Sequence, residues 1–103
     1  MEFSGHTPKC VKTLIHTADA RVAEFEMGPE SGGEAHYHSL VCELCVCLQG
    51  RLQVETGGMV HSLGPGDRLD LAAGVPHQVI NPGKKSCRYL VIQYGGIYDF
   101  ITV

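Results

Sequence analysis

The chain has 103 residues and a mass of 11.1 kDa, a size typical of one domain. Charged residues make up 18%, and 13 glycines and 5 prolines make the chain rich in turns, so we expect neither disorder nor a helical bundle. The net charge is −3, and no basic stripe of the kind that binds nucleic acid is visible. The longest apolar run is far shorter than the roughly 20 residues of a membrane-spanning helix, and Met1 to Cys10 contain no apolar targeting core. We therefore expect a cytoplasmic protein with no nucleic-acid and no membrane partner.

Apolar and polar residues alternate along short segments, which is the period-two pattern of β-strands. No stretch of eleven or more residues has the 3.6-residue apolar repeat of an amphipathic helix. Turns such as Gly64-Pro65-Gly66 and Asn81-Pro82-Gly83 separate the segments at the short spacing of an all-β sandwich or barrel. A closed or double-sheet barrel would hide so many strand edges in a small chain. In chain order, strands are expected near 11–16, 20–27, 35–39, 42–49, 51–56, 59–63, 67–71, 76–80 and 86–94, and Ile97 to Val103 could add one more.

Three histidines and one glutamate have the spacing of metal ligands. His36 and His38 are two residues apart, so on one strand their side chains face the same side. Glu43 begins the next predicted strand, and His77 opens a later one after the turn Gly74-Val75-Pro76. Three nitrogens and one oxygen would leave one or two coordination positions for water, substrate or dioxygen. The spacing alone is a weak signal, because a His-x-His pair recurs by chance in strand-rich proteins.

The sequence around these residues resembles the two motifs of the cupin superfamily. The first, Gly-x5-His-x-His-x3–4-Glu-x6-Gly, corresponds to residues 28–50, and the second, Gly-x5-Pro-x-Gly-x2-His-x3-Asn, to residues 66–81. Two loop or turn positions depart from the pattern. Glu30 stands in place of the first motif's leading glycine, and Ala72 in place of the second motif's proline.

The resemblance implies an all-β fold with a single cupin domain over residues 1–103, of the small RmlC-like kind. Its architecture would be a cupin β-barrel, also described as a double-stranded β-helix or jelly roll. It also implies one divalent metal ion, Fe, Mn, Ni or Zn, inside the barrel, held by the matching residues His36, His38, Glu43 and His77. Outside this set, we expect surface or edge positions for His6, His16 and His61.

The cysteines are interpreted as reduced thiols, because their number is odd and their share is low. If Glu43 faces the barrel interior, Cys45 and Cys47 share its side of the strand and Cys42 lies on the other. We interpret Cys45 and Cys47 as small apolar residues that leave room for a ligand. One alternative is half of a structural zinc site, which would need a turn between the thiolates and a second cysteine pair. The other is a thiol beside a redox-active metal, as an oxidation target or a soft ligand that favours zinc or copper.

Polar groups that line a pocket are not assigned by the sequence, because the inward face of Ser86 to Tyr94 cannot be fixed from it. Pockets combine an apolar lining with a few convergent polar groups. The candidates are Gln78, Arg88, Tyr89, Gln93, Tyr94 and Tyr98.

Two functions from different classes fit these patterns. The first is a metal-dependent enzyme acting on a small oxygenated metabolite, of dioxygenase, isomerase, decarboxylase or lyase type, with Glu43 as a ligand or a general base. The second is a module that binds or senses a small acid or sugar derivative without turnover. We favour the enzyme, because a site with open coordination positions suits substrate activation. By resemblance to small cupins we also expect a homodimer, in which Val11 to Ile15 and Ile97 to Val103 could extend a neighbour's sheet.

Overall fold

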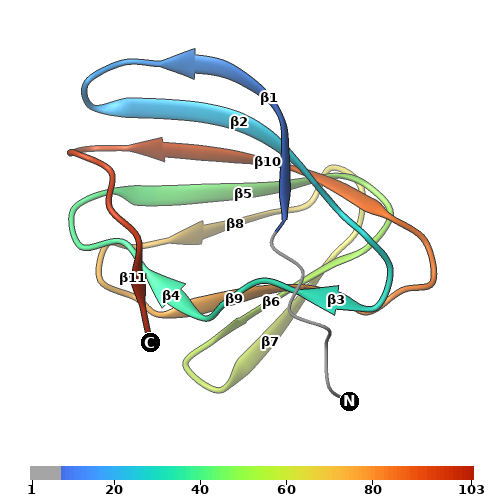
Figure 1. Cartoon of the computed structure of the whole chain (residues 1–103). Helices are drawn as coiled ribbons and strands as arrows, with labels where there is room; N and C mark the ends of the chain where they lie inside the picture. Colours follow the sequence, from blue (N-terminus) through green and yellow to red (C-terminus); the bar gives the residue numbers. More distant parts are fainter. Residues whose placement is uncertain (1–7) are drawn as a thin grey trace.

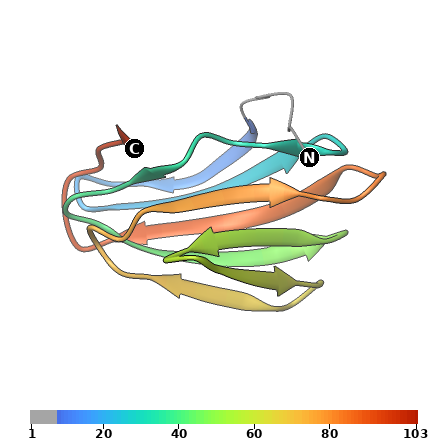
Figure 2. The same cartoon turned by 90° about the horizontal axis from the view of Figure 1, so that it is seen from below.

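The computed structural model describes residues 8–103, which form two antiparallel β-sheets that face each other (Figures 1 and 2). This part of the chain contains strands and no helix, so the predicted all-β fold is confirmed. No helix able to cross a membrane occurs in residues 8–103. The strands are β1 (Lys9–His16), β2 (Ala20–Met27), β3 (Ser31–Gly32), β4 (His36–Tyr37), β5 (Cys42–Gln49), β6 (Leu52–Thr56), β7 (Met59–Leu63), β8 (Arg68–Leu71), β9 (His77–Asn81), β10 (Cys87–Tyr94) and β11 (Ile101–Thr102).

The strand order places segments that are distant in the chain next to each other. The first sheet has the order β1-β2-β10-β5-β8, and the second has the order β11-β4-β9-β6-β7, with β3 also pairing with β9. Successive strands such as β5 and β6 lie in different sheets, so the chain passes repeatedly from one sheet to the other (Figure 2). This is the arrangement of a double-stranded β-helix, and it brings side chains from both halves of the sequence into the space between the sheets.

The core lies between the two sheets and follows from the alternation of the strands. On β5, Cys45 and Cys47 are fully buried, while their neighbours Leu44 and Val46 are only partly buried. The same period of two runs along β10 and β6. Full burial of a large apolar side chain such as leucine or valine contributes about 1.5–3 kcal/mol to the free energy of folding. The core consists of Met27, Cys45, Cys47, Leu52, Val54, Leu63, Leu71, Val79, Cys87, Tyr89 and Val91.

Three short elements differ from the sequence prediction. The strand expected at 35–39 contains only His36–Tyr37, because β4 meets β9 at a single pair of residues. Strand β3 was not predicted, since the glycines around it read as a turn, yet it pairs with Ile80 and Asn81 of β9. The C-terminal segment does add a strand, but β11 has only two residues, and these pair with β4.

Candidate metal centre

Three histidines come together where β4 lies beside β9. His36 and His77 are direct partners across the two strands, and His38 follows β4 immediately. One ring nitrogen of each histidine lies within 4.8 Å of the other two. His38 and His77 are buried, and His36 is half-buried. The structure therefore brings the three histidines of the sequence pattern to one point.

Glu43 joins this cluster from β5 in the opposite sheet. Its Oε1 atom lies 3.2 Å from Nε2 of His38, and its Oε2 atom lies 3.4 Å from Nε2 of His77. Gln93 donates a side-chain amide hydrogen to Oε1 over 2.8 Å. Burial alone would raise the pKa of Glu43, but the neighbouring His38 and His77 and the hydrogen bond from Gln93 hold that pKa well below its usual range. The buried carboxylate is therefore ionised.

Each of the three histidines directs its Nδ1 atom to a backbone carbonyl oxygen. A carbonyl oxygen only accepts hydrogen bonds, so Nδ1 carries a proton, and Nε2 is the nitrogen that bears the lone pair when the ring is neutral. The same bond orients the rings of metal-binding histidines in other proteins. The Nδ1 to oxygen distances are 2.7 Å from His36 to Glu34, 2.6 Å from His38 to Asp99 and 3.0 Å from His77 to Val75.

Two buried nitrogen atoms in this cluster need a partner. Nε2 of His38 and Nε2 of His77 have no hydrogen-bond partner among residues 8–103, and both face the ionised Glu43. Lone pairs that face a buried anion are unfavourable unless a proton or a cation lies between them. A divalent cation satisfies all of these atoms together, and three imidazole nitrogens with one carboxylate oxygen suit Fe, Mn, Ni or Zn. The donor set therefore fits a metal ion.

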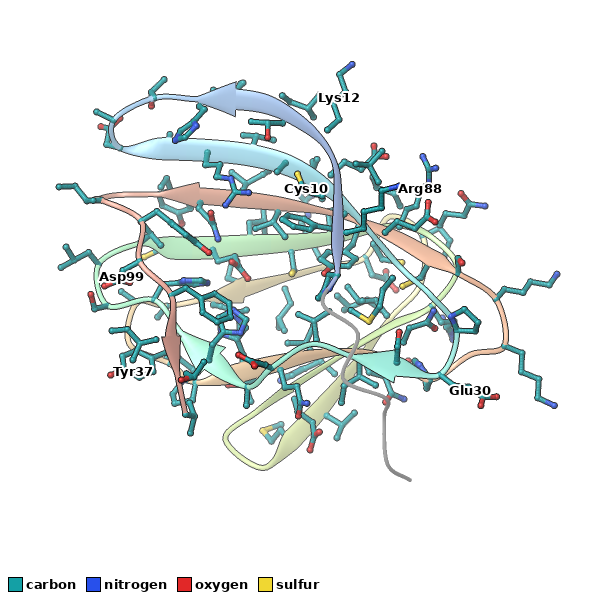
Figure 3. All side chains as sticks on the ribbon, in the orientation of Figure 1. Cys10, Lys12, Glu30, Tyr37, Arg88 and Asp99 are labelled. Atoms are coloured by element: carbon teal, nitrogen blue, oxygen red, sulfur yellow. The ribbon has the colours of Figure 1, made fainter. Side chains whose placement is uncertain are left out.

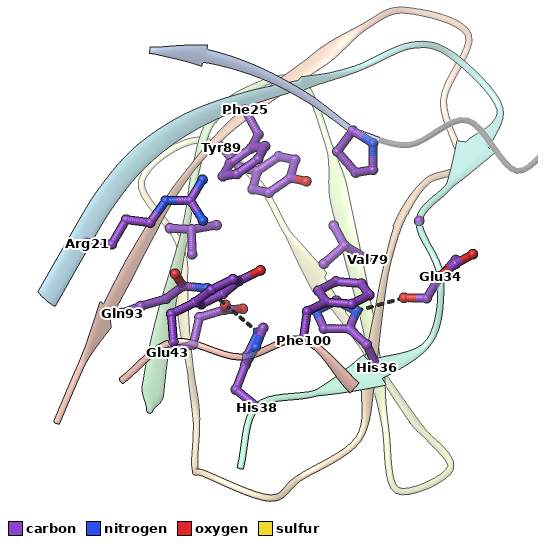
Figure 4. A pocket seen from close by; sticks show the side chains of 14 residues that line it. Arg21, Phe25, Glu34, His36, His38, Glu43, Val79, Tyr89, Gln93 and Phe100 are labelled. Atoms are coloured by element: carbon purple, nitrogen blue, oxygen red, sulfur yellow. Dashed lines mark hydrogen bonds and ion pairs between the residues drawn. The ribbon is translucent and has the colours of Figure 1, made fainter. Parts of the chain in front are cut away.

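The segment after β10 forms one wall of this centre. The ring of Phe100 stacks on His36 with centroids 4.1 Å apart and planes 19° apart (Figure 4). Asp99 accepts hydrogen bonds from the backbone N–H of Ser39 over 2.8 Å and from the Ser39 hydroxyl, in addition to the bond from His38. Sequence reasoning did not assign Asp99 or Phe100 to the site. The sequence signal that could have placed this segment at the site is its pair of aromatic residues, Tyr98 and Phe100.

A cavity of about 340 Å³ lies beside His36, His38 and Glu43 (Figure 4). This volume is at the lower end of the range for small-molecule sites, so it suits a compact metabolite. Most of the wall is apolar. The apolar side chains include Phe25, Val79, Tyr89, Val91 and Phe100, and further polar groups come from Arg21, Glu34, Gln93 and Tyr98.

The structure separates the polar candidates of the sequence into two groups. Tyr89, Gln93 and Tyr98 line the cavity. Tyr94 is exposed. Arg88, which is labelled in Figure 3, alternates with the buried Tyr89 on β10 and forms ion pairs with Glu24 and Glu26. Gln78 donates a hydrogen bond to the carbonyl oxygen of Gly33 over 2.8 Å. Arg21 and Phe25, which also line the cavity, were not among the candidates.

All five cysteines are free, as expected. Cys45 and Cys47 share the buried face of β5 with Glu43, and Cys42 alternates onto the other face. Among residues 8–103, the group of side chains placed to hold a metal contains no cysteine, which argues against the structural zinc site. Sγ of Cys45 lies 3.9 Å from Oε2 of Glu43, so the oxidation hypothesis stays a prediction.

Two further described histidines are not part of the cluster. His16 is exposed on β1, and His61 is half-buried on β7. His6 lies outside the described residues.

Two motif positions have clear structural roles. Glu30, which replaces the motif's glycine, has a φ of 50°, so the backbone keeps the left-handed conformation that glycine adopts more readily. Asn81 is buried at the end of β9, and its amide group donates to three carbonyl oxygens, those of Met27, Gly28 and Lys85. Its Oδ1 atom accepts a hydrogen bond from the N–H of Gly83. Asn81 thus connects the turn after β2 with the loop between β9 and β10.

The model of the Cupin domain matches residues 23–93, which is more than half of the chain. This chain is a member of the cupin superfamily. The match includes the three histidines and Glu43, whereas Asp99 and Phe100 lie beyond it. The predicted extension of one cupin domain over all of residues 1–103 stays a prediction.

Solved structures agree with the cupin fold. An uncharacterised protein with a double-stranded β-helix domain from Klebsiella pneumoniae has a TM-score of 0.84 and 19% identity, over 99% of this chain and 89% of that one. The TT1209 protein from Thermus thermophilus has a TM-score of 0.80 and 19% identity, over 93% and 90%. A DMSP lyase from Ruegeria pomeroyi has a TM-score of 0.76 and 22% identity, over 86% of this chain and 47% of the lyase. No curated protein sequence matches the chain.

Proposed function

We propose that His36, His38, Glu43 and His77 bind one divalent metal ion, Fe, Mn, Ni or Zn, and that this cupin is a metal-dependent enzyme acting on a small oxygenated metabolite. The observation that carries the proposal is the pair of buried Nε2 atoms without a partner, which face an ionised carboxylate beside a cavity. A divalent ion in this position supplies a Lewis acid for an oxygen atom of the substrate.

The side chains around the ion would prepare the site for chemistry. The Nδ1 hydrogen bonds fix the three imidazole rings, and Gln93 fixes the orientation of the Glu43 carboxylate. Glu43 serves as a ligand, or as a general base where its carboxylate is not bound to the ion. Dioxygenase, isomerase, decarboxylase and lyase reactions are all compatible with this ligand set.

The alternative is a module that binds or senses a small acid or sugar derivative without turnover. The engagement of Glu43 by Gln93 and two histidines favours it, because the carboxylate is then less available for proton transfer. The same fold supports either function.

The two functions are distinguished by measuring both the turnover of a metabolite and the thermal stabilisation of the protein by that metabolite. Metal-loaded protein is incubated with a panel of carbonyl and carboxylic acid metabolites, and substrate loss and oxygen consumption are followed together with the melting temperature. The enzyme proposal predicts turnover that is lost in His77→Ala and in Glu43→Gln. Stabilisation by a metabolite without any turnover would instead support the binding module.

We also propose that the chain forms a homodimer. Strand β1 is an edge of the first sheet and is exposed along its whole length, including Val11, Leu14 and Ile15. An exposed apolar edge is a template for pairing with another strand. Light scattering tests this, with a monomeric mass at working concentration as the contradicting result.

A further inference from the structure

We propose that Arg21 is the anion-binding residue of the cavity, and that the ligand is a compact metabolite with a carboxylate or phosphate group. The inference rests on the proposed function, since it names the substrate class of the same site. It is carried by the position of Arg21, by the environment of its guanidinium group and by the charge balance of the cavity.

Strand register places Arg21 in one row with the candidate metal centre. Arg21 on β2 is the direct partner of Gln93 on β10, and Gln93 is the direct partner of Glu43 on β5. Neighbouring strands lie about 4.8 Å apart, so the Cα atoms of Arg21 and Glu43 are separated by about 10 Å. Figure 4 shows Arg21 reaching from β2 toward the cavity that His36 and His38 also line. A small molecule in this cavity can therefore contact the guanidinium group and lie beside the histidines together.

The guanidinium group of Arg21 is held by aromatic rings and not by a carboxylate. Its central carbon lies 5.8 Å from the ring centroid of Phe25 and 5.3 Å from that of Tyr98. Within residues 8–103, no carboxylate lies at ion-pair distance from Arg21, whereas Arg88 on the outer surface contacts both Glu24 and Glu26. A cation–π contact does not need a carboxylate partner, and the planar guanidinium group suits a planar oxyanion through paired N–H donors.

The charges of the cavity favour an anion. Glu43 is already engaged by the histidines and Gln93, and Glu34 is exposed at the rim. A divalent ion carries more positive charge than Glu43 alone can neutralise, and Arg21 adds a further positive charge. Opposite charges attract more strongly beside an apolar wall than in water. Arg21 therefore distinguishes an anionic ligand from a neutral one of the same shape.

The test measures the binding of simple oxyanions to metal-loaded protein. The probes are malonate and inorganic phosphate, with malonamide as the uncharged counterpart of malonate, and calorimetric titration gives each Kd. The variants are Arg21→Gln, Arg21→Lys, and Arg88→Gln as a control that changes an arginine outside the cavity. Metal content and melting temperature are measured for every variant.

We expect malonate or phosphate to bind, with the tighter of the two identifying the anionic group that the site prefers. Arg21→Gln should raise that Kd at least about tenfold, Arg21→Lys should raise it less, and Arg88→Gln should leave it unchanged. Equal Kd values for wild type and Arg21→Gln would overturn the proposal, as would equal binding of malonamide or the absence of oxyanion binding.

The metal measurement separates this inference from the proposed function. Oxyanion binding that depends on Arg21 in a protein that takes up no metal would contradict the metal-dependent enzyme and leave the assignment of Arg21 standing. Oxyanion binding to metal-loaded protein that is unaffected by substitution of Arg21 would contradict the role of Arg21 and leave the metal-dependent enzyme standing.

Discussion

Nδ1 of His38 lies 2.6 Å from the backbone carbonyl oxygen of Asp99, which connects the first motif to the segment after β10. Asp99 is itself held by the backbone N–H and the hydroxyl of Ser39, the residue that follows His38. The ring orientation of His38 thus depends on a segment outside the matched Cupin domain, residues 23–93.

Replacement of Asp99 by alanine should weaken metal binding. Loss of both bonds to Ser39 lets the C-terminal segment move, and the carbonyl oxygen that orients His38 moves with it. Changes in groups that orient a ligand typically weaken metal binding 10- to 100-fold, and we expect about tenfold here. Competition with a chelating dye measures the effect. Asp70→Ala, at an exposed position on β8, is the control, and equal metal affinities of the two variants would argue against this role.

Gln93→Leu should also weaken metal binding, by a different route. Leucine has a similar size but cannot donate to Oε1 of Glu43, so the carboxylate loses the bond that orients it. We expect about a tenfold loss of metal affinity with little change in melting temperature. The same substitution at the exposed Gln49 is the control. Unchanged metal affinity in Gln93→Leu would show that His38 and His77 alone position Glu43.

Asn81→Ala should destabilise the fold without touching the metal centre directly. The substitution leaves the carbonyl oxygens of Met27, Gly28 and Lys85 without their donor in a mostly buried region. Each unsatisfied buried group costs about 1–3 kcal/mol, so we expect a loss of about 3 kcal/mol in the free energy of unfolding. Urea unfolding measures this loss. Asn81→Asp, which keeps the acceptor for Gly83 but not the donors, should be destabilised as well, and wild-type stability in both variants would refute the role.

The buried thiols predict a loss of stability at alkaline pH. Burial raises the pKa of Cys87 from its ordinary value of 9.0 to about 11, and it raises the pKa of Cys45 in the same direction. Below pH 9 the thiols are protonated in both folded and unfolded protein, so they cause no pH dependence. Between pH 9 and 11 the unfolded chain releases the Cys87 proton first, so the free energy of unfolding falls as the pH rises.

Urea unfolding across this pH range measures the effect of the thiols. Cys87→Ala should show a smaller alkaline decline than wild type, whereas Cys10→Ala, at an exposed position, should show the full decline. The same alkaline decline in both variants would contradict the assignment.

The sequence placed His36 and His38 together because that determinant is local, and the resemblance to the two cupin motifs added Glu43 and His77. His36 and His38 share a face through the period of two, and the same rule placed Cys45 and Cys47 beside Glu43 on the buried side of β5. Once a segment is known to be a strand and one of its residues is known to face inward, the period of two gives the facing of the others.

The rest of the site depends on pairing between distant strands, which a local pattern does not encode. The inward face of β10 was undetermined because Tyr89 to Ile92 are apolar on both faces. Arg21 enters the site only through its register with Gln93. Phe100 enters it only because β11 pairs with β4 and brings the C-terminal segment to His36.

The most direct test of the metal centre is elemental analysis of untagged protein purified without a chelating resin. It compares wild type, the double variant His36→Ala, His77→Ala, and His61→Ala, which removes a histidine outside the cluster. We predict about one equivalent of a divalent metal in wild type and in His61→Ala, and almost none in the double variant. Equal metal content in all three proteins, or none in wild type even after reconstitution, would contradict the proposed centre.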